Sequence, residues 1–172
     1  MNLKLITRFL LASIIGLALW ACVDESEDYV PPTKAEEAAL LSEYLDTLQN
    51  RGLDIDTTSM GVYYIIDSVG NGNYAYAGDT CVVKYTGFFL TGDVFDTSGS
   101  NTFQFVLEGD NLIEGWTDGM KVIDEGGKAY LIVPSEHAYG TNGVMDYYGN
   151  YSIPPNTSLV FYIEMVEIKP LD

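Results

Sequence analysis

The chain is poor in basic residues, histidine and cysteine. Its 172 residues include 8 Lys and Arg, one His and two Cys, against 25 Asp and Glu, so the formal net charge is −17. Such an acidic chain cannot neutralise phosphates, which excludes a nucleic-acid-binding function. The single histidine and the two cysteines form no metal-ligand cluster and the glycines form no phosphate-binding motif, so neither a metal nor an organic cofactor is expected. Paired carboxylates of the kind a glycoside hydrolase needs are also missing from the pattern.

The start of the chain has the composition of an export signal. Lys4 and Arg8 make it basic, and residues 9–20 form an apolar run that is too short for a permanent membrane-spanning helix. Cys22 follows this run directly after an alanine and resembles the end of a lipobox, where the thiol receives a diacylglycerol before cleavage. We therefore predict a lipoprotein signal peptide over residues 1–21 and lipidation of Cys22.

An acidic segment follows Cys22. Residues 23–28 are mostly acidic and resemble the export tags of some Bacteroidetes surface lipoproteins. With Pro31 and Pro32 they predict a solvated, extended tether over residues 22–32. The expected location is the cell envelope, with a lipid anchor in the outer membrane and a domain that faces either the periplasm or the outside.

Residues 34–51 carry the pattern of an amphipathic helix. Thr33 and Glu36 have the spacing of a capping box, and Gly52 is a suitable stop. We assign the helix and its linker to residues 33–56. The helix would pack on the domain or extend the tether, or else act as an arm for dimerisation or for holding a client protein.

Beyond this helix the pattern changes to that of β-strands. β-branched and aromatic residues between glycine-rich or polar breaks predict strands over residues 61–69, 80–90, 103–107, 127–133 and 158–168. Residues 111–124 carry apolar side chains three or four positions apart and predict one short helix. We expect residues 57–172 to form an α+β domain in which an antiparallel sheet wraps around that helix, with Cys81 buried in it as a small hydrophobic residue.

Short sequence blocks occur in a fixed order along this domain. They are residues 82–87 (VVKYTG), 92–98 (GDVFDTS), 103–105 (FQF), 112–116 (LIEGW), 138–140 (AYG), 153–155 (IPP) and 159–161 (LVF). Each block alone is a weak signal, but together they resemble the signature of FKBP-type peptidyl-prolyl cis/trans isomerases. The resemblance implies an FKBP-like fold and an enzyme that acts on proline-containing, unfolded or exported client proteins.

The resemblance also implies an aromatic pocket for a prolyl ring. The implied catalytic residues are Tyr85, Phe95, Asp96, Ile113, Trp116 and Tyr139, and the implied substrate-binding residues are Phe103, Leu112, Ile153 and Phe161. Trp116 would form the floor, while the Ile113 amide and the Tyr139 hydroxyl would donate hydrogen bonds to substrate carbonyls. Asp96 would either accept a hydrogen bond from Tyr85 or face the rotating carbonyl carbon.

Two aromatic residues near these blocks are expected to lie outside the pocket. Phe105 is assigned to the opposite face of its strand from Phe103, and His137 to the surface. Rotation of a prolyl bond requires neither a nucleophile nor a proton transfer, so a lone histidine is not needed.

The loop over residues 141–152 departs from the family pattern. Many relatives carry a histidine in the loop after Ala-Tyr-Gly, whereas this loop is longer and has Tyr147, Tyr148 and Tyr151 instead. These tyrosines would replace a pocket wall or bind an extended peptide, or would only cap the loop. The altered loop keeps two other functions open, a non-catalytic proline-peptide-binding or chaperone lipoprotein, and a surface lipoprotein for adhesion or glycan capture.

Overall fold

The structure is a computed structural model, and it describes residues 29–171. The predicted signal peptide, Cys22 and most of the predicted tether lie outside this range. The helical elements are α1 (Lys34–Asn50), α2 (Glu114–Gly119), η1 (Met120–Val122) and η2 (Ser135–His137). The strands are β1 (Asp56–Thr57), β2 (Tyr63–Ser68), β3 (Thr80–Phe89), β4 (Val94–Thr97), β5 (Phe103–Val106), β6 (Lys128–Val133), β7 (Val144–Met145), β8 (Tyr151–Ile153) and β9 (Leu159–Lys169).

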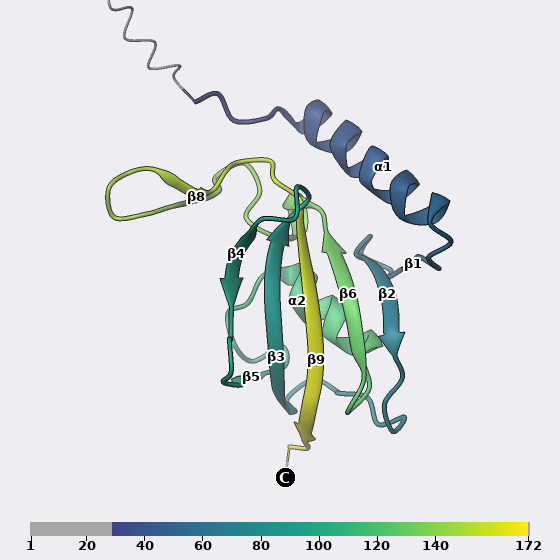
Figure 1. The fold of residues 1–172 in the computed structure, drawn as a ribbon. Helices are drawn as coiled ribbons and strands as arrows, with labels where there is room; N and C mark the ends of the chain where they lie inside the picture. Colours follow the sequence, from purple (N-terminus) through teal and green to yellow (C-terminus); the bar gives the residue numbers. More distant parts are fainter. Residues whose placement is uncertain (1–28, 172) are drawn as a thin grey trace, which may run out of the picture.

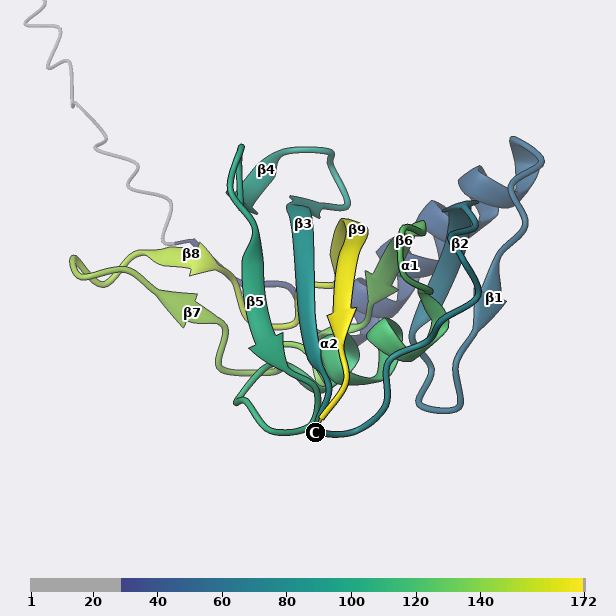
Figure 2. The same cartoon turned by 90° about the horizontal axis from the view of Figure 1, so that it is seen from below.

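Seven of these strands form one antiparallel sheet (Figure 1). Its order is β1-β2-β6-β9-β3-β4, and β5 pairs with β3 as well. Two short strands pair with successive parts of the long strand β3: β5 pairs with residues 80–83 and β4 with residues 86–88. β7 and β8 pair only with each other and form a hairpin that projects beyond the sheet (Figure 2).

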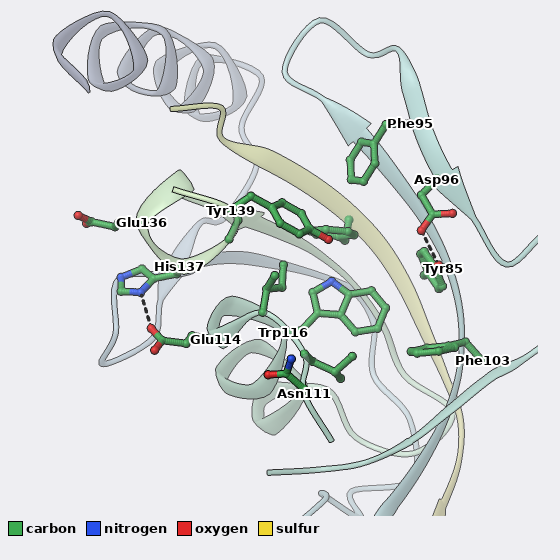
Figure 3. A pocket seen from close by; sticks show the side chains of 14 residues that line it. Tyr85, Phe95, Asp96, Phe103, Asn111, Glu114, Trp116, Glu136, His137 and Tyr139 are labelled. Atoms are coloured by element: carbon green, nitrogen blue, oxygen red, sulfur yellow. Dashed lines mark hydrogen bonds and ion pairs between the residues drawn. The ribbon is translucent and has the colours of Figure 1, made fainter. Parts of the chain in front are cut away.

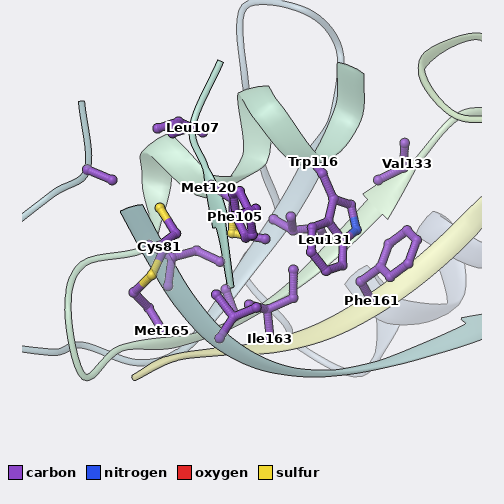
Figure 4. Packing of buried hydrophobic residues seen from close by; sticks show 14 of the residues in the cluster. Cys81, Phe105, Leu107, Trp116, Met120, Leu131, Val133, Phe161, Ile163 and Met165 are labelled. Carbon is purple, nitrogen blue, oxygen red and sulfur yellow. The ribbon is translucent and has the colours of Figure 1, made fainter. Parts of the chain in front are cut away.

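One face of the sheet packs against α2. Side chains alternate along β6 and β9, so Leu131 and Val133 on β6 and Phe161 and Ile163 on β9 point to this face. They meet Trp116 and Met120, and the cluster is the main hydrophobic core (Figure 4). The predicted α+β fold, an antiparallel sheet wrapped around a short helix, is confirmed.

The opposite face of the sheet packs against α1. Ile132 on β6 and Val160 on β9, each one position along from a core residue, form a second buried cluster with Leu41. The helix begins with the predicted capping box, in which the Glu36 amide donates to Thr33 Oγ1 and the Thr33 amide donates to Glu36. It ends at Asn50, before Gly52, whose φ of +80° favours glycine. Of the roles left open for this helix, packing on the domain is the one observed.

Cys81 lies in β3 and is fully buried, as predicted, and burial raises its pKa to about 11. No helix within residues 29–171 combines the length and the apolar character needed to cross a bilayer.

Candidate active site

A cavity of about 550 Å³ opens between α2, the sheet and the turn after η2 (Figure 3). Its lining residues are Tyr85, Phe95, Asp96, Phe103, Asn111, Leu112, Ile113, Glu114, Trp116, Glu136, His137, Ala138, Tyr139 and Phe161. All the residues that the sequence assigned to the pocket are in this set except Ile153. Residues that lie 76 positions apart in the chain therefore surround one opening, from Tyr85 to Phe161.

Different elements supply the walls of this pocket. β3 supplies Tyr85, β4 supplies Phe95, β5 supplies Phe103 and β9 supplies Phe161. These strands are neighbours because β3 pairs with β4, β5 and β9. The sheet curls around α2 at this point, so its aromatic side chains converge on the helix.

Trp116 lies at the centre of the aromatic side chains. It is 5% exposed, and its ring centroid lies 5.0 Å from that of Tyr85, 5.3 Å from that of Phe161 and 6.0 Å from that of Phe103. All three contacts are edge-to-face, an arrangement that aromatic rings favour. Trp116 Nε1 is buried and has no hydrogen-bond partner within residues 29–171. The indole therefore forms an apolar floor with one free donor.

Asp96 gives the pocket a polar rim. Its Oδ2 accepts a hydrogen bond of 2.7 Å from the Tyr85 hydroxyl, and its Oδ1 accepts one of 2.8 Å from the Thr97 amide. The first of the two arrangements proposed for Asp96 is thus the one present. Burial, and then the bond to Asp96, raise the pKa of Tyr85 well above 10, so the phenol stays a neutral donor. Burial and the nearby Asp96 also raise the pKa of Tyr139.

Ile153 does not line this pocket. It lies in β8, pairs with Val144 and is buried in the main core. Ile153 therefore anchors the base of the β7–β8 hairpin to the core, because its buried side chain packs against other apolar residues there. Ile153 is therefore not among the residues that line the cavity, and its assignment to the substrate site stays a prediction.

The tyrosines of the long loop also lie away from the pocket. Tyr147 and Tyr148 are 96% and 84% exposed near the tip of the hairpin, and Tyr151 packs against Tyr29. They do not replace a pocket wall.

The assignment of Phe105 to the face opposite Phe103 was wrong, since residues two apart on a strand share a face. The two rings stack at 5.7 Å, and Phe105 is buried below the pocket without lining it.

Sequence reasoning missed a polar end of the pocket. Asn111, Glu114, Glu136 and His137 line it, and His137 Nδ1 lies 3.6 Å from Glu114 Oε2. His137 is half-buried, not a surface side chain. In the sequence, only the closeness of His137 to Tyr139 could have indicated this place. A residue two positions from a pocket tyrosine in a tight turn is held near the same opening.

The comparisons with known proteins agree with this geometry. Residues 72–166 match the sequence model described as FKBP-type peptidyl-prolyl cis-trans isomerase. A Haemophilus influenzae protein named "Probable FKBP-type peptidyl-prolyl cis-trans isomerase" is 36% identical over 120 residues, which are 70% of this chain and 48% of that protein. FkpA of Escherichia coli, named as an FKBP-type peptidyl-prolyl cis-trans isomerase, is 39% identical over 67% of this chain and 41% of its own length.

Two solved structures extend the similarity to the fold. The crystal structure of Escherichia coli FkpA has a TM-score of 0.63 at 33% identity and covers 80% of this chain and 62% of that chain. A peptidyl-prolyl cis-trans isomerase of Pseudomonas syringae has a TM-score of 0.69 at 28% identity and covers 83% of this chain and 99% of that chain. The chain spans a little under half the length of the two curated relatives named above. From the matched segment, the shared fold and the converging aromatic residues, the chain belongs to the family of FKBP-type peptidyl-prolyl cis-trans isomerases.

Proposed function

We propose that this chain speeds cis/trans isomerisation of bonds that precede proline in unfolded or exported client proteins. The observation that carries the proposal is the convergence of Tyr85, Phe95, Phe103, Trp116 and Phe161 on one opening. The aromatic side chains around this opening suit the pyrrolidine ring of proline, and the hydroxyl of Tyr139 suits a carbonyl beside it.

The chemistry asks little of titratable groups. Rotation about a prolyl bond breaks amide resonance against a barrier of roughly 18–20 kcal/mol, but it makes and cleaves no covalent bond. The planar amide is more charge-separated than the twisted one, so an aromatic pocket that excludes water favours the twisted form. Asp96 accepts a hydrogen bond from the Tyr85 hydroxyl and so holds that hydroxyl at the rim of the pocket.

A protease-coupled assay on prolyl peptides tests the activity. We expect Asp96→Ala to lower kcat/KM by roughly tenfold, because it removes the carboxylate that holds the Tyr85 hydroxyl at the rim of the pocket. A tenfold loss corresponds to about 1.4 kcal/mol of transition-state stabilisation. Tyr139→Phe, which removes one predicted donor, is expected to lower it as well. Asp93→Ala is the matched control, since Asp93 precedes β4 and lies outside the pocket, and among the described residues its side chain accepts a hydrogen bond only from the Thr91 hydroxyl. Parent-like activity in both pocket variants would overturn the site assignment.

The location in the envelope is part of the proposal. The export-like start of the chain, Cys22 and the acidic segment after it support an outer-membrane lipoprotein that faces the periplasm or the outside. Labelling with a radioactive fatty acid, followed by membrane fractionation, tests the anchor. We expect Cys22→Ser to lose both the label and the membrane association, whereas Cys81→Ser keeps them.

A non-catalytic client-binding protein is the second candidate function. The specific observation that favours it is the projecting hairpin with its exposed Tyr147 and Tyr148. Suppression of aggregation of an unfolded client without turnover of prolyl peptides would select this candidate. A dimer through α1 stays a prediction, and it would have to use exposed residues such as Leu40, because Leu41 is already buried against the sheet.

A further inference from the structure

Helix α1 sends a buried carboxylate into the domain. Glu37 is 7% exposed, and its Oε1 accepts hydrogen bonds of 2.7 Å from the Ser135 amide and 2.7 Å from the Ser158 hydroxyl. Its Oε2 accepts a bond of 2.6 Å from the Ser135 hydroxyl. The two serines lie 98 and 121 positions away along the chain. Charge-assisted bonds of this length are strong and directional, so Glu37 fixes the place of Ser135 relative to the helix.

Ser135 is in turn bonded to both neighbours of Tyr139. Its carbonyl accepts a bond of 2.9 Å from the Ala138 amide and one of 2.8 Å from the Gly140 amide. The Ser135 amide and hydroxyl thus donate to α1, while the Ser135 carbonyl bonds to the residues on either side of Tyr139. The Tyr139 side chain is 37% exposed, and no hydrogen bond within residues 29–171 holds its hydroxyl. Its position over the pocket accordingly follows from its backbone.

A second connection runs beside the first. The Asn156 side chain donates a bond of 2.8 Å to the Pro32 carbonyl, and the Asn156 amide donates one of 2.8 Å to the Gly140 carbonyl. The segment before α1 thus reaches the same turn by a separate route. Residue 156 has a φ of +50°, which asparagine tolerates better than most residues, so this contact uses a suitable residue for an unusual backbone.

Packing alone does not account for the carboxylate. Leu41, one turn along α1, already buries apolar surface against Ile132 and Val160. An apolar side chain at position 37 could fill the same space, but it would leave the Ser135 amide and the two serine hydroxyls without an acceptor. What the carboxylate adds is direction, since its bonds define where a turn of the pocket lies.

We propose that Glu37 is a positioning residue that holds Tyr139 over the pocket through Ser135. The inference rests on the proposed isomerase function and deepens it, because it makes α1, which precedes the family match at residues 72–166, a part that sets the pocket geometry. The matched segment alone would then keep the aromatic floor but leave the Tyr139 turn without its support.

The test compares Glu37→Leu with Glu43→Leu in the full chain. Glu43 lies on the same helix but is exposed, so it controls for the substitution itself. One measurement is kcat/KM on prolyl peptides. The other is the fluorine NMR resonance of Tyr139 in protein labelled with 3-fluorotyrosine, which is assigned by its loss in Tyr139→Phe.

We expect Glu37→Leu to shift or broaden the Tyr139 resonance and to lower kcat/KM by about tenfold, since displacing a positioned group by 1 Å can cost ~100-fold. In the Tyr139→Phe background the same substitution should cost less than about twofold, because coupled residues are not additive. Glu43→Leu should change neither measurement. A Glu37→Leu protein with a lower melting temperature but a parent-like resonance and kcat/KM would overturn the inference.

Failure of the inference can be separated from failure of the proposed function. If the parent chain has no isomerase activity, the proposed function fails, and the Tyr139 resonance alone decides whether Glu37 positions the turn. If Glu37→Leu does not fold, Ser135→Ala is read by the same two measurements, since it removes a single hydroxyl from the connection.

Discussion

A glycine on β3 makes room for one wall of the pocket. A Cβ atom at Gly87 would lie 2.6 Å from Phe95 Cζ, which is closer than carbon atoms approach without a shift. Phe95 in turn packs 5.6 Å from Phe161, ring centroid to ring centroid. The tip of the Phe95 ring can therefore approach β3 this closely only because residue 87 has no side chain.

We expect Gly87→Ala to push Phe95 out of its place and to lower kcat/KM more than it lowers stability. Overpacking a core costs about 1–3 kcal/mol, and the low end applies here because Phe95 is half-buried and can move. Urea unfolding and the prolyl-peptide assay measure the two effects. Thr86→Ala, at the preceding position, is the control. A loss of stability with parent-like kcat/KM would mean that the Phe95 ring does not form part of the binding surface.

Two hydrogen-bonded tyrosines predict how stability depends on alkaline pH. Burial and the bond to Asp96 raise the pKa of Tyr85 far above its ordinary value of 10, and burial together with the bond to Asp67 raises that of Tyr162 to about 12. Below pH 10 both tyrosines are neutral in the folded and the unfolded chain, so their contribution to stability is complete. Above pH 10 the unfolded chain loses these protons first, and the free energy of unfolding falls as the pH rises toward the folded pKa values.

The measurement is urea unfolding at pH 9 and at pH 11. We expect the parent to lose stability between these values and the Tyr85→Phe, Tyr162→Phe double variant to lose less. Tyr147→Phe is the control, because this side chain is exposed and forms no hydrogen bond to a carboxylate among the described residues. An equal loss in the parent and the double variant would contradict the role given to these two tyrosines.

The fold was predictable at the level of elements where the signal was local. Helix α1 was expected over residues 34–51 and runs over Lys34–Asn50, because its capping box and its glycine stop are all within the segment. The long strands were found within a few residues for the same reason. The predicted helix over residues 111–124 is α2 followed by the 3-10 turn η1, so the apolar spacing was right but the backbone tightens after Gly119.

The short elements and part of the site were not predictable in this way. β1, β4, β7 and β8 are two to four residues long and exist only because a partner strand lies beside them. Ile153 follows the same rule, since its burial depends on where the hairpin folds back. Glu37 shows the limit most clearly, because a glutamate on a helix predicts a solvated face unless the two distant serines are known.

The β7–β8 hairpin is an element that the domain can lose without losing its core. The hairpin forms no strand pairing with the main sheet, and Tyr147 and Tyr148 in its tip, residues 145–150, are exposed. We expect replacement of residues 145–150 by a short turn to change the preference among prolyl peptides more than it changes the melting temperature. A peptide series that varies the residue before proline, with calorimetry of both proteins, measures this.

The hairpin with both tip tyrosines changed to serine is the matched control, since it keeps the backbone and removes only the aromatic rings. If the preference is altered equally in this control, the rings carry the effect. A collapsed melting temperature with unchanged preference would contradict the prediction.

On the scale of the whole molecule, the sheet is covered on both faces but the surface carries charge of mainly one sign. α2 covers one face and α1 the other, through two separate buried clusters. With 25 acidic and 8 basic side chains, ion pairs such as Lys34 with Glu136 can neutralise only a minority of the carboxylates. These pairs are exposed, so each contributes little.

Repulsion among the unpaired carboxylates predicts that salt stabilises the fold. The Debye length falls from about 30 Å at 0.01 M salt to about 10 Å at 0.1 M, so added sodium chloride screens repulsion across much of the surface. We expect the melting temperature to rise by a few degrees over this range, since ~1 kcal/mol corresponds to ~2–4 °C for a protein of this size. Glu43→Gln with Asp46→Asn, which removes two exposed charges from α1, should start higher at low salt and gain less. A melting temperature that falls with salt would mean that attraction between opposite charges, not repulsion, dominates this surface.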